Sequence, residues 1–440
     1  MFRPLTMIAP VALLALAACN TEPQTDDTQT TQTTADTGTD YGYVTYGEDN
    51  LADTMASNDA AYMSGNGGGN SSSTDGTMQS DIPDPEDRPI MQAQVVLDRQ
   101  GWGPGVIDGK MGMSTENALK GFQEANDLET SGKLDDATKQ ALAEWDRIPA
   151  TRVVTIPANW ANTEYTDMPE EVEAKAELQR LGYKSLDERL AERFHTTVEV
   201  LKQLNPDGMP AGMSEAQGGM TPASASPASP SPSPSPSASK SPSPSPSANA
   251  SGSSTQRAAN DSYFTAGQQI RVPNIGGDRI APGDVEDRNW QQTLASLGVG
   301  TDQKQVDKIV VSKAGKTLKA YQGDKLVALF TVSSGSSQFP LPLGEWKILG
   351  EAYNPPYTYS PEVLSGGKEE GESYKLPPGP NSPVGVVWID LSKEHYGIHG
   401  TPDPETIGRA QSSGCVRLTN WDAARLAGMV SQSTQVVFEA

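Results

Sequence analysis

Two histidines and a cysteine lie close together near the C-terminus, and their residue types suit nucleophilic catalysis. Cys415 is the only cysteine after the first twenty residues, and His395 and His399 precede it in the chain. An imidazole titrates in the range that activates a thiol at neutral pH, so either histidine could serve as its base. Gly400 and Gly414 allow close backbone approach, which suits a turn that aims amide groups at an oxyanion. The alternative is a buried structural cysteine, because free cysteine is among the most buried residue types.

The spacing of these residues forms a longer motif. Residues 398–401 read IHGT, and residues 412–420 read SSGCVRLTN. This pattern resembles the signature of the L,D-transpeptidase catalytic domain. The resemblance implies that Cys415 is the nucleophile and that His399 is the general base. From the residues alone His395 stays an alternative base, because on a shared strand it would point to the same face as His399.

The resemblance also assigns the groups around the thiol. It implies that backbone amides at Gly414 and Ser413 stabilise the oxyanion. It further implies that Arg417 and Gly400 bind the substrate, with Arg417 holding a carboxylate. Many relatives carry a histidine where this chain has Ser413. A hydroxyl donates one hydrogen bond but cannot share a charge, so an electrostatic role at this position does not carry over.

The implied reaction is an acyl transfer on peptidoglycan. Cys415 would attack the carbonyl of the third residue of a stem peptide, release D-Ala and hold the acyl group as a thioester. An amine would then accept it, either another stem, which gives a 3–3 crosslink, or a protein lysine. A hydrolase, in which water is the acceptor, and an inactive wall-binding anchor are the alternatives. No cofactor and no metal are expected, because the sequence has no cluster with ligand spacing.

Composition limits the number of domains and the partners. The 440 residues leave room for about two to four domains, and only 35% of them are hydrophobic. We therefore expect a multidomain chain whose packed units are separated by long disordered linkers. The net charge of −23 argues against binding to nucleic acid, which favours basic surfaces.

The motif must be positioned by the C-terminal region, residues 289–440. Short apolar segments alternate with turns there, and Gly323-Asp324 is typical of a hairpin. One helix is expected up to Val430, with Asn420 as its N-cap. We predict a β-rich sandwich or barrel, as the resemblance also implies. Its strands are expected at Lys308–Ser312, Thr317–Gln322, Leu326–Ser333, Gly344–Leu349, Val384–Leu391 and Val436–Glu439.

Residues 354–383 interrupt this pattern. They are rich in proline and glycine and show no periodicity. A loop of this length in a compact domain is usually functional, and the segment resembles the lid over the cleft of the family. Tyr357 and Tyr374 are candidate substrate-binding residues, and Tyr359 could line the same acceptor channel. Alternatively, these tyrosines pack the loop onto the sheet.

Residues 89–147 show three segments of helical periodicity. Ser114 and Asp135 are the expected N-caps of the second and third helices. The D-G-x-x-G-x-x-T turn that begins at Asp108 resembles the small all-α peptidoglycan-binding domain. The resemblance implies peptidoglycan as a partner, and a helical spacer without a ligand is the alternative.

Residues 171–275 contain two helical stripes followed by the strand-like segment QIRVP. This region resembles a LysM glycan-binding module, interrupted at about residues 209–260 by a disordered Ser-Pro insert. His195, at the end of the first helix, is expected to be a surface or capping residue. If no such module forms, the insert is an interdomain linker.

The N-terminus is typical of a secreted lipoprotein. Residues 1–18 have the charge and the short apolar run of a signal peptide. Leu16 to Cys19 resembles a bacterial lipobox, which implies lipidation of Cys19 and a membrane anchor. Asn20 resembles the sorting residue of outer-membrane lipoproteins, so a periplasm-facing protein is expected; an ordinary cleaved signal is the alternative. Residues 19–88, acidic and polar, are predicted to be a disordered tether to the cell wall.

Overall fold

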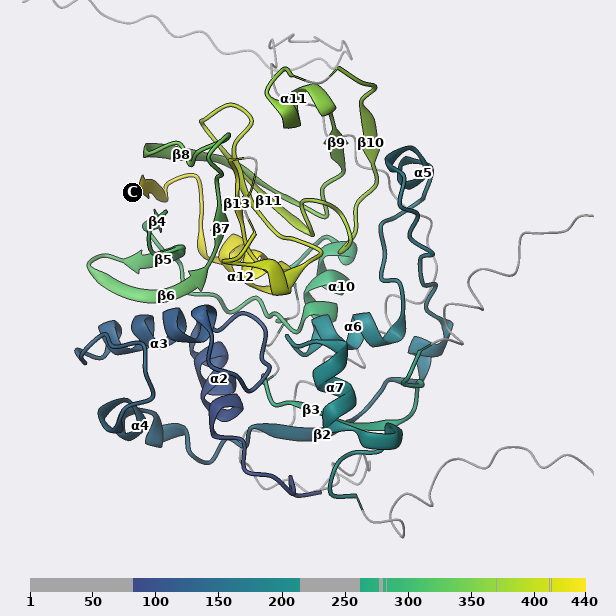
Figure 1. The fold of residues 1–440 in the computed structure, drawn as a ribbon, viewed down its shortest axis with the longest axis vertical. Coiled ribbons are helices and arrows are strands. Elements are labelled where there is room, and N and C mark those ends of the chain that lie inside the picture. The colour runs from purple at the N-terminus through teal and green to yellow at the C-terminus, as the bar shows by residue number, and fades with distance from the viewer. Residues whose placement is uncertain are drawn as a thin grey trace, which may run out of the picture. The chain divides into compact units, whose positions relative to one another are not determined.

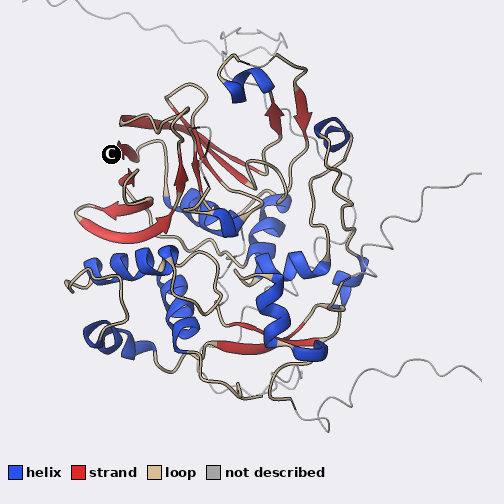
Figure 2. Cartoon of the chain, in the orientation of Figure 1, coloured by secondary structure: helices blue, strands red, loops and turns tan. Residues whose placement is uncertain are grey.

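The computed structural model describes residues 82–213, 262–276, 280–281, 283–368, 370–410, 412 and 414–440. The expected signal peptide, Cys19, most of the tether, most of the Ser-Pro insert and Ser413 lie outside the described residues. Within the described ranges, no helix is long and apolar enough to cross a membrane. Figure 2 shows the strands concentrated in the C-terminal part of the chain, with β2 and β3 apart from them.

The first unit is helical, as predicted. It consists of α2 (Pro89–Gln100), α3 (Met113–Ala125), α4 (Asp136–Leu142) and η1 (Ala143–Trp145) (Figure 1). The Asp135 side chain accepts a hydrogen bond from Thr138 N, which confirms it as an N-cap. Ser114 was wrongly expected to cap α3, which begins at Met113 after Gly112. The short strand β1 (Trp102–Gly103) pairs in parallel with β6 (Lys325–Thr331) and joins this unit to the C-terminal sheet.

A glutamine holds the glycine turn of this unit. Gln94 Nε2 donates to Asp108 Oδ1 and Thr115 Oγ1, at 3.1 and 3.0 Å. Its Oε1 accepts from Gly109 N at 2.8 Å. Gln123 binds the following turn in the same way, through its own amide. The motif that suggested a peptidoglycan-binding domain is therefore a turn fixed by a buried side chain.

The second unit begins and ends with a strand, and three short α-helices lie between the two strands. Its elements are β2 (Thr151–Thr155), η2 (Ala158–Asn162), α5 (Val172–Ala176), α6 (Leu186–Arg193), α7 (Val198–Leu204), η3 (Pro206–Gly208) and β3 (Gln269–Pro273). β2 and β3 are antiparallel, with Thr151 opposite Pro273. Ser185 and Thr197 cap α6 and α7 through their side chains. The two expected helices are present, whereas β2 was missed because it precedes the predicted start of the region.

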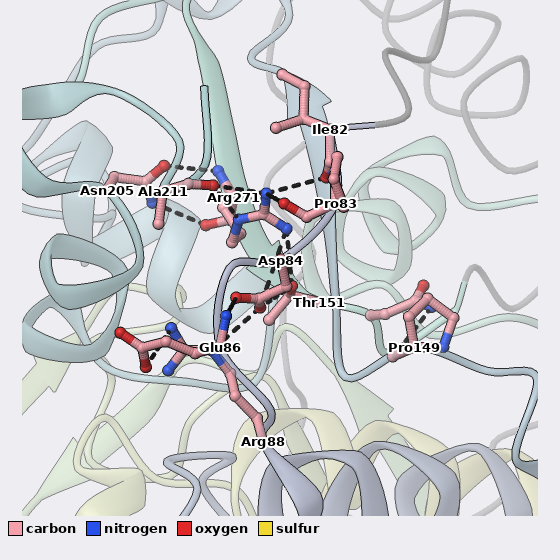
Figure 3. A network of polar contacts seen from close by, with 11 residues as sticks. Ile82, Pro83, Asp84, Glu86, Arg88, Pro149, Thr151, Asn205, Ala211 and Arg271 are labelled. Atoms are coloured by element: carbon pink, nitrogen blue, oxygen red, sulfur yellow. Dashed lines mark hydrogen bonds and ion pairs between the residues drawn. The ribbon is translucent and has the colours of Figure 1, made fainter. Parts of the chain in front are cut away.

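Arg271 of β3 ties the chain before α2 to this second unit. Its guanidinium donates to the backbone carbonyls of Ile82 and Pro83 at 3.0 Å and of Ala211 at 2.7 Å. It also donates to Thr151 Oγ1 at 3.0 Å, as Figure 3 shows. Only 1% of the residue is exposed. Each N–H group of a buried guanidinium needs a hydrogen-bond acceptor, and here most of the acceptors are uncharged oxygens.

The C-terminal domain is β-rich, as predicted. Besides β6, its strands include β4 (Lys308–Ser312), β5 (Thr317–Gln322), β7 (Ser333–Ser334), β8 (Gly344–Tyr353), β11 (Val387–Leu391), β12 (Gly397–His399), β13 (Val416–Arg417) and β14 (Gln435–Glu439). Together with β1 of the first unit, these strands form one ten-stranded sheet in the order β1-β6-β5-β4-β14-β8-β11-β12-β13-β7. The domain also contains the helices α10 (Arg288–Leu297) and α12 (Asn420–Met429), and η4 (Pro404–Thr406) follows β12. The helix α12 carries Trp421, which is fully buried in the core between helix and sheet.

The segment predicted to be an aperiodic lid has secondary structure of its own. β9 (Tyr357–Tyr359) and β10 (Tyr374–Leu376) pair antiparallel, with Tyr374 opposite Tyr359. Between them lies the short helix α11 (Pro361–Ser365), capped by Ser360. The expectation of an irregular loop was therefore wrong, because strands of three residues are too short to produce a visible alternation.

Three buried side chains connect the three parts of the described chain. Asp98 of α2 accepts from both terminal nitrogens of Arg425 of α12, at 2.8 and 2.9 Å, and lies 3.1 Å from His195 Nδ1. His195 Nε2 lies 2.8 Å from Leu297 O, and its ring stacks on Trp421 with 4.7 Å between centroids. His195 is fully buried, so the prediction of a surface residue was wrong, whereas its φ of 53° and the bond from its N–H to Glu192 O agree with a capping position after α6. Its partners are distant in sequence, and local periodicity cannot identify them.

Candidate active site

Strand pairing brings the residues of the motif together. β12 and β13 are parallel, with Ile398 opposite Val416 and His399 opposite Arg417. Cys415 directly precedes β13, at the level of Gly397. Because alternate residues of a strand share one face, the thiol lies on the same face as Arg417. His399 pairs with Arg417 across the two strands, so its imidazole lies on that face as well. The strand register therefore puts these groups on one face of the sheet, through the pairing of segments that are separate in the chain.

His399 is held in one tautomer. Its Nδ1 lies 2.7 Å from the carbonyl oxygen of Gly400. A carbonyl can only accept, so Nδ1 carries the hydrogen and Nε2 keeps a free lone pair. The ring also stacks on Trp388, its cross-strand partner, with 5.3 Å between centroids. Burial, and then the Arg417 guanidinium, lower the pKa of His399 from 6.5 to about 3, so the imidazole is neutral and can act as a base.

The thiol is half-buried and protonated at rest. Cys415 Sγ lies 3.7 Å from the backbone carbonyl oxygen of His395. Burial raises the pKa of Cys415 above its usual value of 9.0, and the Gly397 backbone and Arg417 oppose that shift. Both Cys415 and His399 are thus neutral before substrate binds. Attack on a carbonyl must then be coupled to transfer of the thiol proton.

His395 contributes its backbone and not its ring. It precedes β12 in a turn with φ of 65°, so the expectation that it lies on the same strand as His399 was wrong. Its side chain is 65% exposed, with Nε2 3.6 Å from Glu394 Oε1. The structure therefore favours His399 over His395 as the base.

The turn before the cysteine is tightly organised. Gly414 has φ of 109°, and a Cβ at this position would lie 2.6 Å from the ring of Tyr396. Gly414 N donates to Ser412 Oγ at 3.2 Å, and Ser412 Oγ donates to Cys415 O at 2.5 Å. The amide of Gly414 is thus engaged at rest, and the predicted oxyanion role requires that this bond opens. Ser413, the other predicted oxyanion residue, lies outside the described residues.

Two of the four predicted substrate-binding residues, Arg417 and Tyr357, lie near enough to the thiol to interact with it electrostatically. Arg417 is half-buried, and its Nε has no hydrogen-bond partner within the described residues. The pKa of Tyr357 is raised by burial and by Cys415, and lowered by Arg417, which places the phenol near both. The Nε of Arg417 is thus a buried donor without a partner in the described part of the chain.

The other two predicted residues have different partners. Gly400 uses its carbonyl to orient His399. The hydroxyl of Tyr374 donates to Glu372 at 3.2 Å, and Glu173 of α5 also contributes to the raised pKa of Tyr374. Tyr374 therefore interacts with acidic residues around the lid, and Gly400 acts through the base.

Sequence reasoning missed two residues of the site. Trp388 was not singled out, although its position on β11 opposite His399 follows once the strand register is known. Asn420 was expected to cap α12, but Thr419 is the N-cap and accepts from Asp422 N at 3.1 Å. The Asn420 amide instead donates to Pro380 O at 3.1 Å. Neither role leaves a signal in a single sequence.

Residues 307–438 match the L,D-transpeptidase catalytic domain family, and residues 86–142 match the family described as "Putative peptidoglycan binding domain". The "Putative L,D-transpeptidase YkuD" of Bacillus licheniformis is 30% identical over 164 residues, or 37% of this chain and 79% of that protein. The protein of the same name from Bacillus subtilis is 34% identical over 128 residues, or 29% of this chain and 63% of that protein. A solved L,D-transpeptidase from Mycobacterium smegmatis matches 30% of this chain and 58% of that chain, with TM-score 0.26 and 21% identity.

The first of these matches covers the domain that contains Cys415, His399 and Arg417. The Bacillus licheniformis relative is aligned over more than two thirds of its length. The first unit, whose glycine turn is fixed by Gln94, coincides with the second family match. The chain belongs to the L,D-transpeptidase family.

Proposed function

We propose that Cys415 and His399 carry out acyl transfer on peptidoglycan stem peptides. The observation that carries this proposal is the fixed tautomer of His399, whose Nε2 lone pair lies on the face that presents the thiol. The charged guanidinium of the half-buried Arg417 would supply a site for a substrate carboxylate. Stem peptides end in a carboxylate next to the bond that is cleaved, which suits a guanidinium at this position.

The proposed reaction has two steps. In the first, Sγ bonds to the carbonyl carbon of the third stem residue, His399 takes the thiol proton, and the proton passes to the departing amine of D-Ala. In the second, an acceptor amine attacks the thioester, the carbon–sulfur bond breaks, and the proton returns to the thiolate. The acceptor is a second stem, which gives a 3–3 crosslink; a protein lysine or water would give the alternative products.

The other parts of the chain fit delivery to the cell wall. The first unit matches a peptidoglycan-binding family, and the second contains the two helices and the final strand on which the LysM-like interpretation rests. Lipidation of Cys19 would place the protein on a membrane facing the periplasm, as the sequence around it predicts. Cys19→Ala should release the protein from membranes without loss of catalysis, and retention of this variant after a high-salt wash would count against the anchor.

The reaction is tested with the purified chain and tetrapeptide stems. Liquid chromatography separates crosslinked dimers from tripeptide, and we expect dimers in excess. Intact-mass spectrometry with a carbapenem, a strained acyl donor, should show one covalent adduct that Cys415→Ser abolishes. Tripeptide alone despite abundant amine acceptor would favour the hydrolase, and absence of any adduct would favour the inactive anchor.

A further inference from the structure

A glutamate from outside the catalytic domain reaches the residues behind the base. Glu192 lies in α6 of the second unit, and its Oε1 accepts from Asn420 Nδ2 at 2.7 Å. Asn420 is the first residue of α12 and is fully buried. Burial raises the pKa of Glu192 from 4.5 to about 7, although hydrogen bonds from Tyr183 and Asn420 oppose the shift. Burying a carboxyl group is costly, so this contact requires an explanation.

The Asn420 amide has one permitted orientation. Its Nδ2 donates to Glu192 and also to Pro380 O at 3.1 Å. Its Oδ1 accepts from Val386 N at 3.3 Å. Two acceptors on one side and a donor on the other distinguish the NH2 group from the oxygen. Without Glu192 the NH2 group keeps only Pro380 O, and the reversed amide becomes accessible.

The same amide supports the turn that holds the imidazole. A Cβ at Gly400 would lie 2.2 Å from Asn420 Oδ1, and a Cβ at Gly385 would lie 1.9 Å from it. Both turns therefore close directly on this oxygen. The carbonyl of Gly400 is the acceptor that fixes His399 Nδ1 at 2.7 Å. A rotation of the Asn420 amide would change the contact with Gly400 and so the position of the ring.

We propose that Glu192 is a positioning residue for His399, acting through Asn420 and Gly400. The inference rests on the proposed role of His399 as general base. It means that the catalytic domain reaches its full rate only while α6 of the second unit is docked against α12. A change in the second unit would then alter catalysis without touching the thiol or its substrate.

Independent contacts hold this part of the second unit in place. Leu181 N donates to Pro378 O at 2.9 Å, and Leu181 O accepts from Asn381 N at 3.0 Å. Asn381 Nδ2 also donates to Gly182 O at 2.8 Å. A Cβ at Gly379 would lie 2.2 Å from Leu181 O, so the two backbones are in direct contact. These bonds fix the residues before α6 against the end of the lid segment.

The test compares Glu192→Ala, Glu192→Gln and Glu199→Gln in the full chain. Glu199 is an exposed glutamate of α7 and serves as the matched control. The rate of carbapenem acylation of Cys415 is followed by stopped-flow fluorescence and intact mass over a range of carbapenem concentrations. We expect Glu192→Ala to lower the maximal rate by about 10- to 100-fold with little change in half-saturation. Glu192→Gln, which keeps an acceptor oxygen, should recover most of the rate, and Glu199→Gln should equal the wild type.

Nitrogen-15 NMR of His399 separates positioning from a general loss of structure. The wild type should show the Nδ1–H tautomer, and Glu192→Ala should show a mixture or the other tautomer. A slower Glu192→Ala variant with an unchanged His399 tautomer would overturn the inference, as would an unchanged rate. If Cys415→Ser and His399→Ala still form the adduct, the proposed function itself fails. If both lose it while Glu192→Ala reacts normally, only the positioning role fails.

Discussion

Two clusters in this molecule each contain one histidine and one arginine, and they use them in opposite ways. The closed cluster is Asp98, His195 and Arg425, where the two terminal nitrogens of Arg425 bond both oxygens of Asp98. The open cluster is Cys415, His399 and Arg417, where the Nε of Arg417 has no partner within the described residues. Arg425 is 4% exposed, whereas Arg417 is only half-buried.

The difference lies in how many donors and acceptors are occupied. His195 Nε2 faces the carbonyl of Leu297 and its Nδ1 faces the carboxylate of Asp98. Both ring nitrogens of His195 are therefore occupied by hydrogen-bond partners. His399 has one nitrogen bonded and is neutral. The same residue types therefore stabilise the structure where every ring nitrogen has a hydrogen-bond partner. They are available for chemistry where one ring nitrogen has none.

The largest expected effect separates the two histidines nearest the thiol. His399→Ala should lower the rate of Cys415 acylation by about 10²- to 10⁴-fold, the usual contribution of a general base. His395→Asn is the control, because asparagine tolerates the positive φ of that position. It should change the rate by less than about threefold. Carbapenem acylation followed by intact mass measures both, and the opposite pattern would move the base to His395.

The next effect concerns the stability of the closed cluster. Arg425→Met leaves the Asp98 carboxylate buried without its bidentate partner and should lower the free energy of unfolding by about 3–5 kcal/mol. Adding Asp98→Leu removes the buried, unpaired carboxylate, so the double variant should recover much of the lost free energy of unfolding. Urea unfolding of the full chain gives both values. A single variant as stable as the wild type would show that the closed cluster does not hold the units together.

The open cluster could be predicted from the sequence, but the closed cluster could not. Cys415 and His399 belong to a short motif with fixed residue types, and two parallel strands then bring them together. His195 looked like a surface residue because it follows a helix and is polar. Its partners Asp98 and Arg425 come from other units, and one sequence contains no signal for such long-range pairs.

Some secondary-structure elements were also missed, for similar reasons. The strands of the C-terminal sheet were found where apolar residues alternate, as in β4 and β5. The lid strands β9 and β10 were missed because each has three residues. Asn420 was assigned a local capping role, although its amide binds Glu192 and Pro380, which are far from it in the chain. Local patterns identify elements, whereas positioning contacts depend on the assembled fold.

A smaller effect is expected from Arg417. Arg417→Ala removes the free Nε and the charge that would hold a substrate carboxylate, and should raise the KM for tetrapeptide stems by about 10-fold. Stability should change by less than about 1 kcal/mol, because the donor is unpaired in the folded chain. Steady-state kinetics and thermal unfolding test the two statements. A large loss of stability with an unchanged KM would place Arg417 with the closed cluster.

The smallest effect is a pH dependence that should be nearly absent. With its pKa lowered to about 3, His399 stays neutral as the pH falls from 7 to 5. The rate of acylation should therefore fall by less than about twofold because of this group. An imidazole at its usual pKa of 6.5 would be mostly protonated at pH 5, and the rate would fall about 25-fold between pH 7 and pH 5. Arg417→Ala removes one cause of the lowered pKa, so its acid limb should move toward neutral pH. Rates of carbapenem acylation between pH 4.5 and 8 measure both profiles. A wild-type acid limb centred near pH 6.5 would show that the base is exposed and solvated, contrary to the buried ring stacked on Trp388.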